Sequence, residues 1–305
     1  MDFDNLPDTN DMIGASKAAA AVLPVIAQVF PGWTMQSIGK AESKRTDRII
    51  SDLKKIAENK DTLGLDDDSI GYLMSDVVQR HNRCNNFDHV LRLASPMVKD
   101  GSGGSKVSTE WAEHFRDHAE KATGEEVRAT WAKILASEIN KPGSFSKRTL
   151  TILSDMEKAD ADAFMRLCAM CILPTSGTTV TLNPILLLDE DECGTSFNSG
   201  RFDYGMRSSL ESLGLIDSSV TSLLELGPEE RAEYITGKSV YRIENPTEIK
   251  VTLSFSPVLT KYGRELSTLF LPQHMDDVGE ILRRKAEIAG LACERYRVVP
   301  ASAFS

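Results

Sequence analysis

Apolar residues recur at helical spacing through the first part of the chain. Residues 34–61 place isolated apolar side chains among many charged ones, which is typical of a surface helix. A second helix is predicted from residue 70, because Asp66–Ser69 offers side chains that cap a helix start. A further helix runs through residues 87–93 and ends near Pro96. We expect these helices to form an N-terminal region.

The segment Lys99–Lys106 contains three glycines and two serines, which predicts a flexible linker. After it the helical pattern resumes. One later helix carries a single apolar stripe, formed by Val127, Trp131, Ile134, Leu135 and Ile139.

A turn follows that striped helix. Pro142 cannot continue the helix and Gly143 permits a sharp turn, after which Ser144 or Ser146 starts a new helix. We therefore interpret Trp131, Pro142 and Gly143 as structural residues.

Short apolar runs bounded by turn residues replace the helical pattern later in the chain. Residues 240–243 and 249–255 are predicted strands, and the second alternates apolar with polar side chains. A short helix at 206–213 precedes them. The order of helix and hairpin is similar to a winged-helix module in which 240–255 would be the wing. Residues 217–239 would then be an insertion, which disfavours the DNA-binding version of that module.

These patterns predict a mainly α protein with a small α+β part. The predicted divisions are a helical N-terminal region (1–98), a helical domain (106–173), a winged-helix-like α+β domain (174–272), and a C-terminal helix and tail (273–305). Long charged helices with apolar stripes also indicate self-association or a protein partner.

Charge and cysteine content narrow the class of protein. The 305 residues include 45 acidic and 35 basic side chains, a net charge of −10, which disfavours a nucleic-acid-coating surface without excluding a local basic patch. The five cysteines form no recognisable disulfide framework, so we predict a cytoplasmic protein.

The most apolar stretch is residues 18–30. It is too short to span a membrane, is broken by Pro24 and follows an acidic start. It either packs on this chain or a second copy, or contacts lipid. The second alternative would make the protein peripheral at the inner membrane.

Two pairs of residues have the spacing of metal or redox sites. His114 and His118 lie four positions apart, so one helix face can present both imidazoles to a metal. No third ligand is identifiable, and a solvated or capping role explains the pair equally well. Cys168 and Cys171 have the spacing of a redox or zinc pair. No second cysteine pair exists, which favours buried structural thiols.

A cluster of hydroxyls and cations lies after the Pro142–Gly143 break. It consists of Ser144, Ser146, Lys147, Arg148 and Thr149. A helix start can hold an anion there, because its N–H groups are unpaired and its dipole attracts negative charge. The alternative is an ordinary helix cap with surface cations. The sequence has no glycine-rich phosphate loop and no nucleophile elbow, so we predict no cofactor and favour a non-enzymatic protein.

From about residue 79 to 270 the chain resembles a bacterial family catalogued only as domain of unknown function 2806. The segments that carry the resemblance are 80–90, the stretch 125–150 from Glu125 to Leu150, and 160–168. A looser similarity runs to abortive-infection proteins of the Abi-alpha type. The resemblance implies no reaction. It implies a bacterial or phage-borne accessory protein with a link to phage defence.

Three functions follow as hypotheses. The first is a non-enzymatic interaction protein, acting through a protein partner or a membrane. The second is a winged-helix DNA-binding regulator with Arg201 and Arg207 near the DNA. The third is an enzyme with an unrecognised anion site near residues 144–149.

Overall fold

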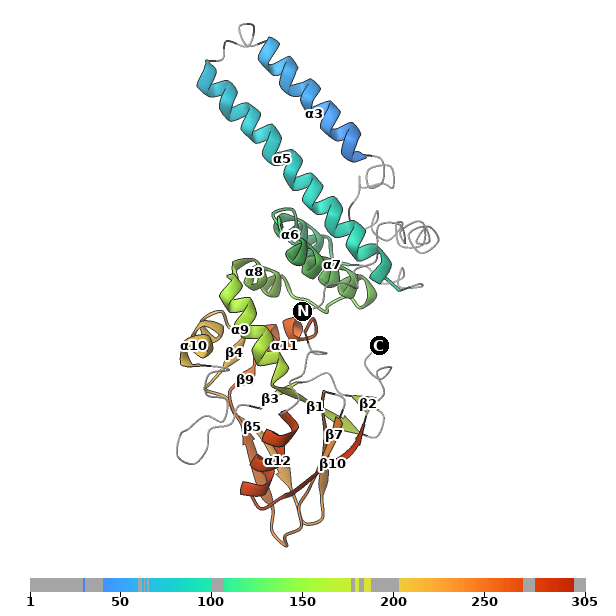
Figure 1. The fold of residues 1–305 in the computed structure, drawn as a ribbon, viewed down its shortest axis with the longest axis vertical. Coiled ribbons are helices and arrows are strands. Elements are labelled where there is room, and N and C mark those ends of the chain that lie inside the picture. Colours follow the sequence, from blue (N-terminus) through green and yellow to red (C-terminus); the bar gives the residue numbers. More distant parts are fainter. Residues whose placement is uncertain are drawn as a thin grey trace. The chain divides into compact units, whose positions relative to one another are not determined.

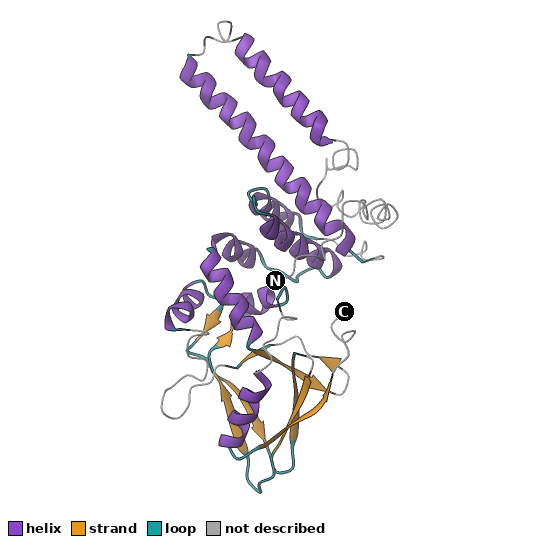
Figure 2. Ribbon diagram, viewed as in Figure 1, coloured by secondary structure: helices purple, strands orange, loops and turns teal. Residues whose placement is uncertain are grey.

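The computed structural model describes Phe30 and residues 41–59, 62, 64, 66–99, 107–176, 179–180, 184–187, 203–237, 239–270 and 278–298. The chain divides into two compact units, Met1–Leu150 and Thr151–Ser305. Among the described residues, all strands belong to the second unit, so the protein is a mixed α+β protein (Figure 2). The four divisions predicted from the sequence stay predictions.

The first unit is helical throughout its described length. Its elements are α3 (Ala41–Glu58), α5 (Asp67–Ala94), the 3-10 helix η2 (Ser95–Met97), α6 (Thr109–Ala119), α7 (Glu125–Asn140) and the start of α8 (Lys147–Asp155).

The two helices predicted at 70–78 and 87–93 are one continuous helix, α5. The residues between them are polar but include no Pro or Gly, so nothing interrupts the backbone hydrogen bonds. Asp66 caps α5 by accepting a hydrogen bond from the Ser69 N–H at 2.7 Å, as the sequence predicts.

Helices α3 and α5 form an antiparallel pair, seen at the blue end of Figure 1. The C-terminal half of α5 packs on α6 and α7, whereas residues 67–85 of α5 lie beside α3. We call α3 together with residues 67–85 of α5 the arm. Among its described side chains only Ile70 is buried.

An aromatic cluster forms the core of the first unit. Phe115 of α6 lies between Trp111, whose ring stacks on it at 5.1 Å, and Trp131 of α7, which meets it edge-on at 5.5 Å. Phe87 of α5 lies 6.3 Å from Phe115, and Phe30 lies 5.0 Å from Phe87. The core therefore joins three helices at one end of α5.

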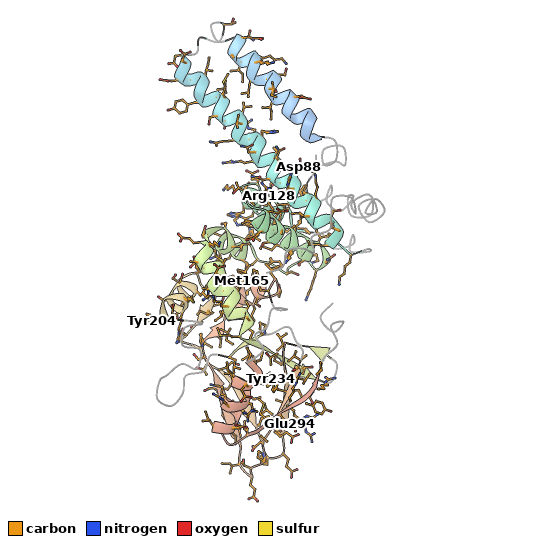
Figure 3. The ribbon with its side chains drawn as sticks, viewed as in Figure 1. Asp88, Arg128, Met165, Tyr204, Tyr234 and Glu294 are labelled. Atoms are coloured by element: carbon orange, nitrogen blue, oxygen red, sulfur yellow. The ribbon has the colours of Figure 1, made fainter. Side chains whose placement is uncertain are left out.

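A buried polar network ties the same three helices together. Asn86 of α5 donates to the Glu120 carbonyl at 3.1 Å and accepts from the Arg128 guanidinium of α7 at 2.6 Å. Arg128 also donates to the Ala122 carbonyl at 3.1 Å. Figure 3 labels Arg128 beside the C-terminal half of α5. The network fixes how α5 packs on α7.

The second unit combines helices with three antiparallel sheets. Its helices are α9 (Lys158–Ala169), α10 (Tyr204–Ser212), α11 (Lys261–Ser267) and α12 (Val278–Ile288). The main sheet has the order β10 (Ala292–Val298), β7 (Ser239–Glu244), β6 (Arg231–Thr236), β1 (Cys171–Ser176) and β2 (Thr179–Val180), and β3 (Ile185–Leu186) pairs with β1. Two further pairs are β4 (Ile216–Asp217) with β9 (Val258–Leu259), and β5 (Ser222–Leu226) with β8 (Val251–Phe255).

The predicted hairpin 240–255 is wrong. Strand β7 pairs with β6 and β10, whereas β8 pairs with β5, where Leu224 faces Leu253. The segment 217–239, interpreted as an insertion, supplies β5 and β6, which are the true partners of the two strands. The C-terminal tail is likewise a strand, since β10 forms the edge of the main sheet among the described residues.

Helix α12 covers one face of the main sheet. Val278 and Leu282 of α12 belong to one buried cluster with Ile172, Tyr234 and Ile243 of three different strands. Gly279 lies directly on the Tyr241 ring, because an added Cβ would come within 2.1 Å of that ring. The helix therefore approaches the sheet as closely as a glycine permits.

Candidate functional site

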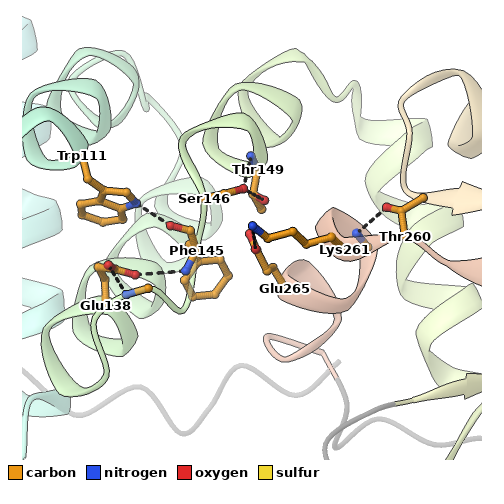
Figure 4. Close-up of polar contacts among 10 residues, drawn as sticks. Trp111, Glu138, Phe145, Ser146, Thr149, Thr260, Lys261 and Glu265 are labelled. Atoms are coloured by element: carbon orange, nitrogen blue, oxygen red, sulfur yellow. Dashed lines mark hydrogen bonds and ion pairs between the residues drawn. The ribbon is translucent and has the colours of Figure 1, made fainter. Parts of the chain in front are cut away.

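The turn between α7 and α8 contains most of the residues that the sequence nominates. Pro142 and Gly143 follow α7 directly, and Gly143 has a φ of 86°, the left-handed conformation that favours glycine. A buried carboxylate holds the turn together (Figure 4). Glu138 accepts hydrogen bonds from the Gly143 N–H at 2.7 Å and from the Phe145 N–H at 3.0 Å.

The other side of this turn is held by Trp111. Its indole Nε1–H donates to the Phe145 carbonyl at 2.7 Å, while its ring belongs to the aromatic core (Figure 4). The Phe145 ring is itself buried. Glu138, Trp111 and Phe145 thus connect the end of α7 to α6, and we call these residues with Pro142 and Gly143 the turn clamp.

The predicted anion-binding residues lie at the start of α8, next to the turn clamp. Ser146 accepts from the Thr149 N–H at 3.3 Å, and the two hydroxyls lie 2.8 Å apart. Ser144 donates to the Lys141 carbonyl at 2.5 Å. The side chains of Ser144 and Ser146 therefore bond local backbone groups, as in the helix-cap alternative that the sequence also allows.

The two cations of that cluster, Lys147 and Arg148, have different environments. Lys147 forms an ion pair with Glu110 at 2.8 Å, and this hydrogen bond lowers the pKa of the Glu110 carboxyl. Arg148 is exposed. The structure brings the five predicted residues together at the start of α8. Four of them, Ser144, Ser146, Lys147 and Thr149, have hydrogen-bond or ion-pair partners within the protein.

His114 and His118 are adjacent on α6, with ring centroids 4.7 Å apart. The His118 ring is parallel to the Trp131 ring at 6.0 Å, so it covers an edge of the aromatic core. Within the described residues, no group of three or more His, Cys, Asp or Glu side chains is arranged to hold a metal ion.

Cys168 lies near the end of α9 and Cys171 begins β1, so the pair spans a helix-to-strand turn. Both side chains are buried. Burial raises the pKa of both thiols, and Cys171 further raises that of Cys168. The Cys171 thiol donates to the Leu167 carbonyl at 3.6 Å, so it bonds within the turn that joins α9 to β1.

One feature that the sequence analysis did not identify is an apolar face on the arm. Along each helix, residues seven apart share a side, and residues three or four apart lie close to it. Helices α3 and α5 pack on each other, and the helical spacing and partial burial of Ile49, Ile56, Ile70 and Val77 indicate that these residues form the seam. On one flank of this seam lie the exposed Ile50, Ala57, Gly71 and Val78, and the half-buried Leu53 and Met74 lie between them and the seam; we call these six residues the apolar arm face.

The opposite flank of the seam is charged. It carries Asp52 and Lys55 of α3, 3.8 Å apart, and Asp76 and Arg80 of α5, 2.8 Å apart. On the apolar arm face, Ile50 is 46% exposed and Val78 41% exposed. The charged flank also carries Leu73, which lies three residues before Asp76 and is 37% exposed. The two flanks therefore differ in their ion pairs, and each leaves some aliphatic surface in solvent.

The structure is that of a mixed α+β protein with a helical arm. The polar residues at the start of α8 form hydrogen bonds and an ion pair within the protein. The chain belongs to the family described as protein of unknown function DUF2806, whose model matches residues 75–282. Comparison with curated proteins and with solved structures finds no match. Helix α3 and the first residues of α5 lie outside the matched span.

No described helix is both long enough and apolar enough to cross a membrane. The predicted lipid-contacting segment 18–30 lies outside the described residues except for Phe30, which is buried. The proposed similarity to Abi-alpha-type proteins stays a prediction.

Proposed function

We propose that this protein is a non-enzymatic interaction protein whose contact surface is the arm. The observation that carries the proposal is the contrast between the two kinds of candidate site. At the turn clamp and the start of α8, polar groups are used inside the fold. On the apolar arm face, Ile50 and Val78 are 46% and 41% exposed and lie outside the buried core.

The arm also has the physical form of a contact element. Helix α5 has 28 residues and is thus about 42 Å long, and its first half lies beside α3 (Figure 1). The other half is fixed by the aromatic core and by the Asn86–Arg128 bond. The packed C-terminal half of α5 thus fixes the position of the arm, and the arm presents its apolar face to a partner.

Affinity capture with matched variants tests this function. Tagged full-length protein is expressed in cells that encode the chain, beside Ile50→Glu/Val78→Glu and the control Ser51→Glu/Gln79→Glu. The control adds the same charge at exposed positions that point away from the seam and the apolar arm face. We expect a captured protein, this chain included, to be at least about ten-fold depleted with the first variant and retained with the control. Identical captured sets from all three would contradict the proposal.

A second candidate function is DNA binding, and one observation favours it. Strands β4 and β9 pair between α10 and α11, the order helix, strand, strand, helix of a winged-helix module. If β4 and β9 are the two wing strands, residues 218–257 are the segment that connects them. Arg207 of α10 already donates to the Ser218 hydroxyl at 3.0 Å, and Arg201 lies outside the described residues.

Fluorescence anisotropy with a labelled DNA duplex tests the second candidate. A DNA-binding protein should bind at 50 mM salt and lose affinity by about ten-fold or more at 200 mM. Absence of binding at 50 mM salt and micromolar protein would exclude it. The acidic net charge of −10 makes the first function the one that we favour.

The cellular setting is part of the proposal. Membrane attachment through residues 18–30 predicts that full-length protein co-sediments with anionic liposomes, whereas a chain lacking residues 1–33 stays in solution. A role in phage defence predicts fewer plaques on cells that carry the gene than on cells with the Ile50→Glu/Val78→Glu variant. Equal plaque counts would show that the contact made by the apolar arm face is not needed for phage defence.

A further inference from the structure

Two histidines of α6 lie next to each other in the first unit, outside the arm. His114 and His118 are four residues apart, so their side chains lie one above the other on the same face of the helix. Both are half-buried. Their ring centroids are 4.7 Å apart and the ring planes cross at 74°, so the two imidazoles meet without stacking on each other.

This separation matches the one that a shared metal ion requires. Zinc binds a histidine nitrogen at about 2.0–2.1 Å, and that nitrogen lies about 1.15 Å from the centre of its ring, so the centroid of a zinc-bound imidazole is about 3.2 Å from the ion. Two such rings that bind at an angle between about 90° and 109° have centroids about 4.5–5.2 Å apart. The observed 4.7 Å falls within this range. Helix α6 therefore holds the two rings at a chelating distance without any change in its backbone.

One of the two rings is held in place by the aromatic core. The His118 ring is parallel to the Trp131 ring, with 6.0 Å between the centroids. Each imidazole has two nitrogens, so one can bind a metal while the other keeps a hydrogen bond within the protein, as is usual for metal-binding histidines. A side chain that is already oriented loses little freedom when it binds a ligand. Packing on Trp131 therefore favours metal binding by His118.

The charges on α6 also favour a bound cation. The helix carries three carboxylates and one arginine. That arginine, Arg116, is two positions from each histidine and thus about 200° away around the helix axis, and it pairs with Glu120 at 3.8 Å. His118 lies in the last turn of α6, where the negative end of the helix dipole stabilises positive charge.

The pair would supply two ligands of the ion. Among the described residues, no group of three or more His, Cys, Asp or Glu side chains could hold a metal ion. Glu110 lies one turn before His114, but its carboxylate pairs with Lys147 at 2.8 Å. Zinc prefers four ligands, so two positions would be filled by water. Such a site suits an exchangeable ion rather than a permanently bound one.

We propose that His114 and His118 form a binding site for one divalent ion of the zinc, nickel and copper class. Imidazole nitrogen suits these ions, whereas magnesium and calcium prefer oxygen ligands. Copper binds nitrogen ligands more tightly than zinc or nickel does. The site belongs to α6 and goes beyond the contact function proposed for the arm.

Isothermal titration calorimetry of full-length protein, first freed of metal with a chelator, tests the proposal. Zn²⁺ should bind, and Cu²⁺ should bind at least about ten-fold more tightly. His114→Ala should weaken the binding of both ions at least about ten-fold, because one of the two protein ligands is lost. His81→Ala is the matched control and should leave binding unchanged, since no second histidine lies one turn from His81 on α5.

Tryptophan fluorescence locates the bound ion. Cu²⁺ quenches a nearby indole, and the Trp131 ring lies next to the His118 ring. Saturable quenching should therefore accompany binding in the original protein and in His81→Ala, and should be lost in His114→Ala. Unchanged far-UV circular dichroism of His114→Ala separates loss of a ligand from loss of folding. If that variant does not fold, His114→Gln, which keeps more of the side-chain volume, takes its place.

The comparison of the two variants decides the proposal. Binding and quenching that are lost in the His114 variant and kept in His81→Ala support the site on α6. Binding that both variants retain, or that both lose, overturns it, and so does the absence of binding at millimolar Zn²⁺ or Cu²⁺. The arm is tested by its own variants, so neither result decides the proposed contact function.

Discussion

Replacing Glu138 with Gln should destabilise the first unit more than any surface substitution. The carboxylate is buried and accepts two backbone N–H bonds, at 2.7 Å from Gly143 and 3.0 Å from Phe145. Glutamine keeps the size of the side chain but offers one acceptor oxygen, so its amide N–H groups would face one of these two donors.

The magnitude follows from what is lost. A hydrogen bond to a charged acceptor contributes about 1.5–3 kcal/mol, and a buried N–H left without an acceptor costs about 1–3 kcal/mol. Because the Phe145 N–H is the buried one, we expect Glu138→Gln to lower the free energy of unfolding by about 3 kcal/mol. For a unit of 150 residues this corresponds to a fall in melting temperature of about 6–12 °C.

Thermal and urea unfolding of full-length protein, followed by Trp111 and Trp131 fluorescence, measures this loss. Glu113→Gln on the exposed side of α6 is the matched control and should change stability by less than about 0.5 kcal/mol. A loss below about 1 kcal/mol for Glu138→Gln would refute the reasoning that the turn clamp holds α7 to α6. The turn would then be held by packing of Phe145.

Three other predictions test the second unit and the predicted anion site. Gly263→Ala should lower the stability of the second unit by about 2–4 kcal/mol in urea unfolding, because the added Cβ would lie 2.0 Å from the Leu215 carbonyl oxygen; unchanged stability would mean that α11 can shift. Burial raises the pKa of the Cys293 thiol to about 11, so its neutral form stabilises the fold below about pH 9 and this stability is lost as the pH rises towards 11; Cys293→Ala should flatten the fall in urea midpoint over that range. Arg148→Ala should change the melting temperature by less than about 1 °C with and without 10 mM phosphate, since Arg148 is exposed; a phosphate-dependent rise that the variant loses would restore the anion site.

Helix starts and ends could be predicted from the sequence, because the residues that determine them are neighbours in the chain. The N-cap at Asp66 and the end of α7 before Pro142 are confirmed, because capping and proline chemistry act within a few residues. The wing hairpin was wrong for the opposite reason. Strand pairing is non-local, and the segment 217–239, an insertion in the winged-helix interpretation, contains β5 and β6, which pair with β8 and β7.

Glu138 could have been found from the sequence. It lies seven residues after Trp131, so it shares the apolar stripe of α7 with a buried tryptophan. An acidic residue at such a position needs hydrogen-bond donors, and the Pro142–Gly143 turn supplies them just beyond the end of the helix. The Asn86–Arg128 bond had no such signal, because it joins residues 42 positions apart on two helices.

The apolar arm face was hidden for a different reason. The strongest apolar stripe of α3 and of α5 is the seam that the two helices bury against each other. Ile50 and Val78 lie beside their seams, where a single aliphatic residue on one helix is unremarkable. Only when the two helices are paired do Ile50 and Val78 come to the same side of the arm, while the ion pairs Asp52–Lys55 and Asp76–Arg80 lie on the other. A surface assembled from two helices is a property of their pairing, so this contact surface becomes visible only in the folded arm.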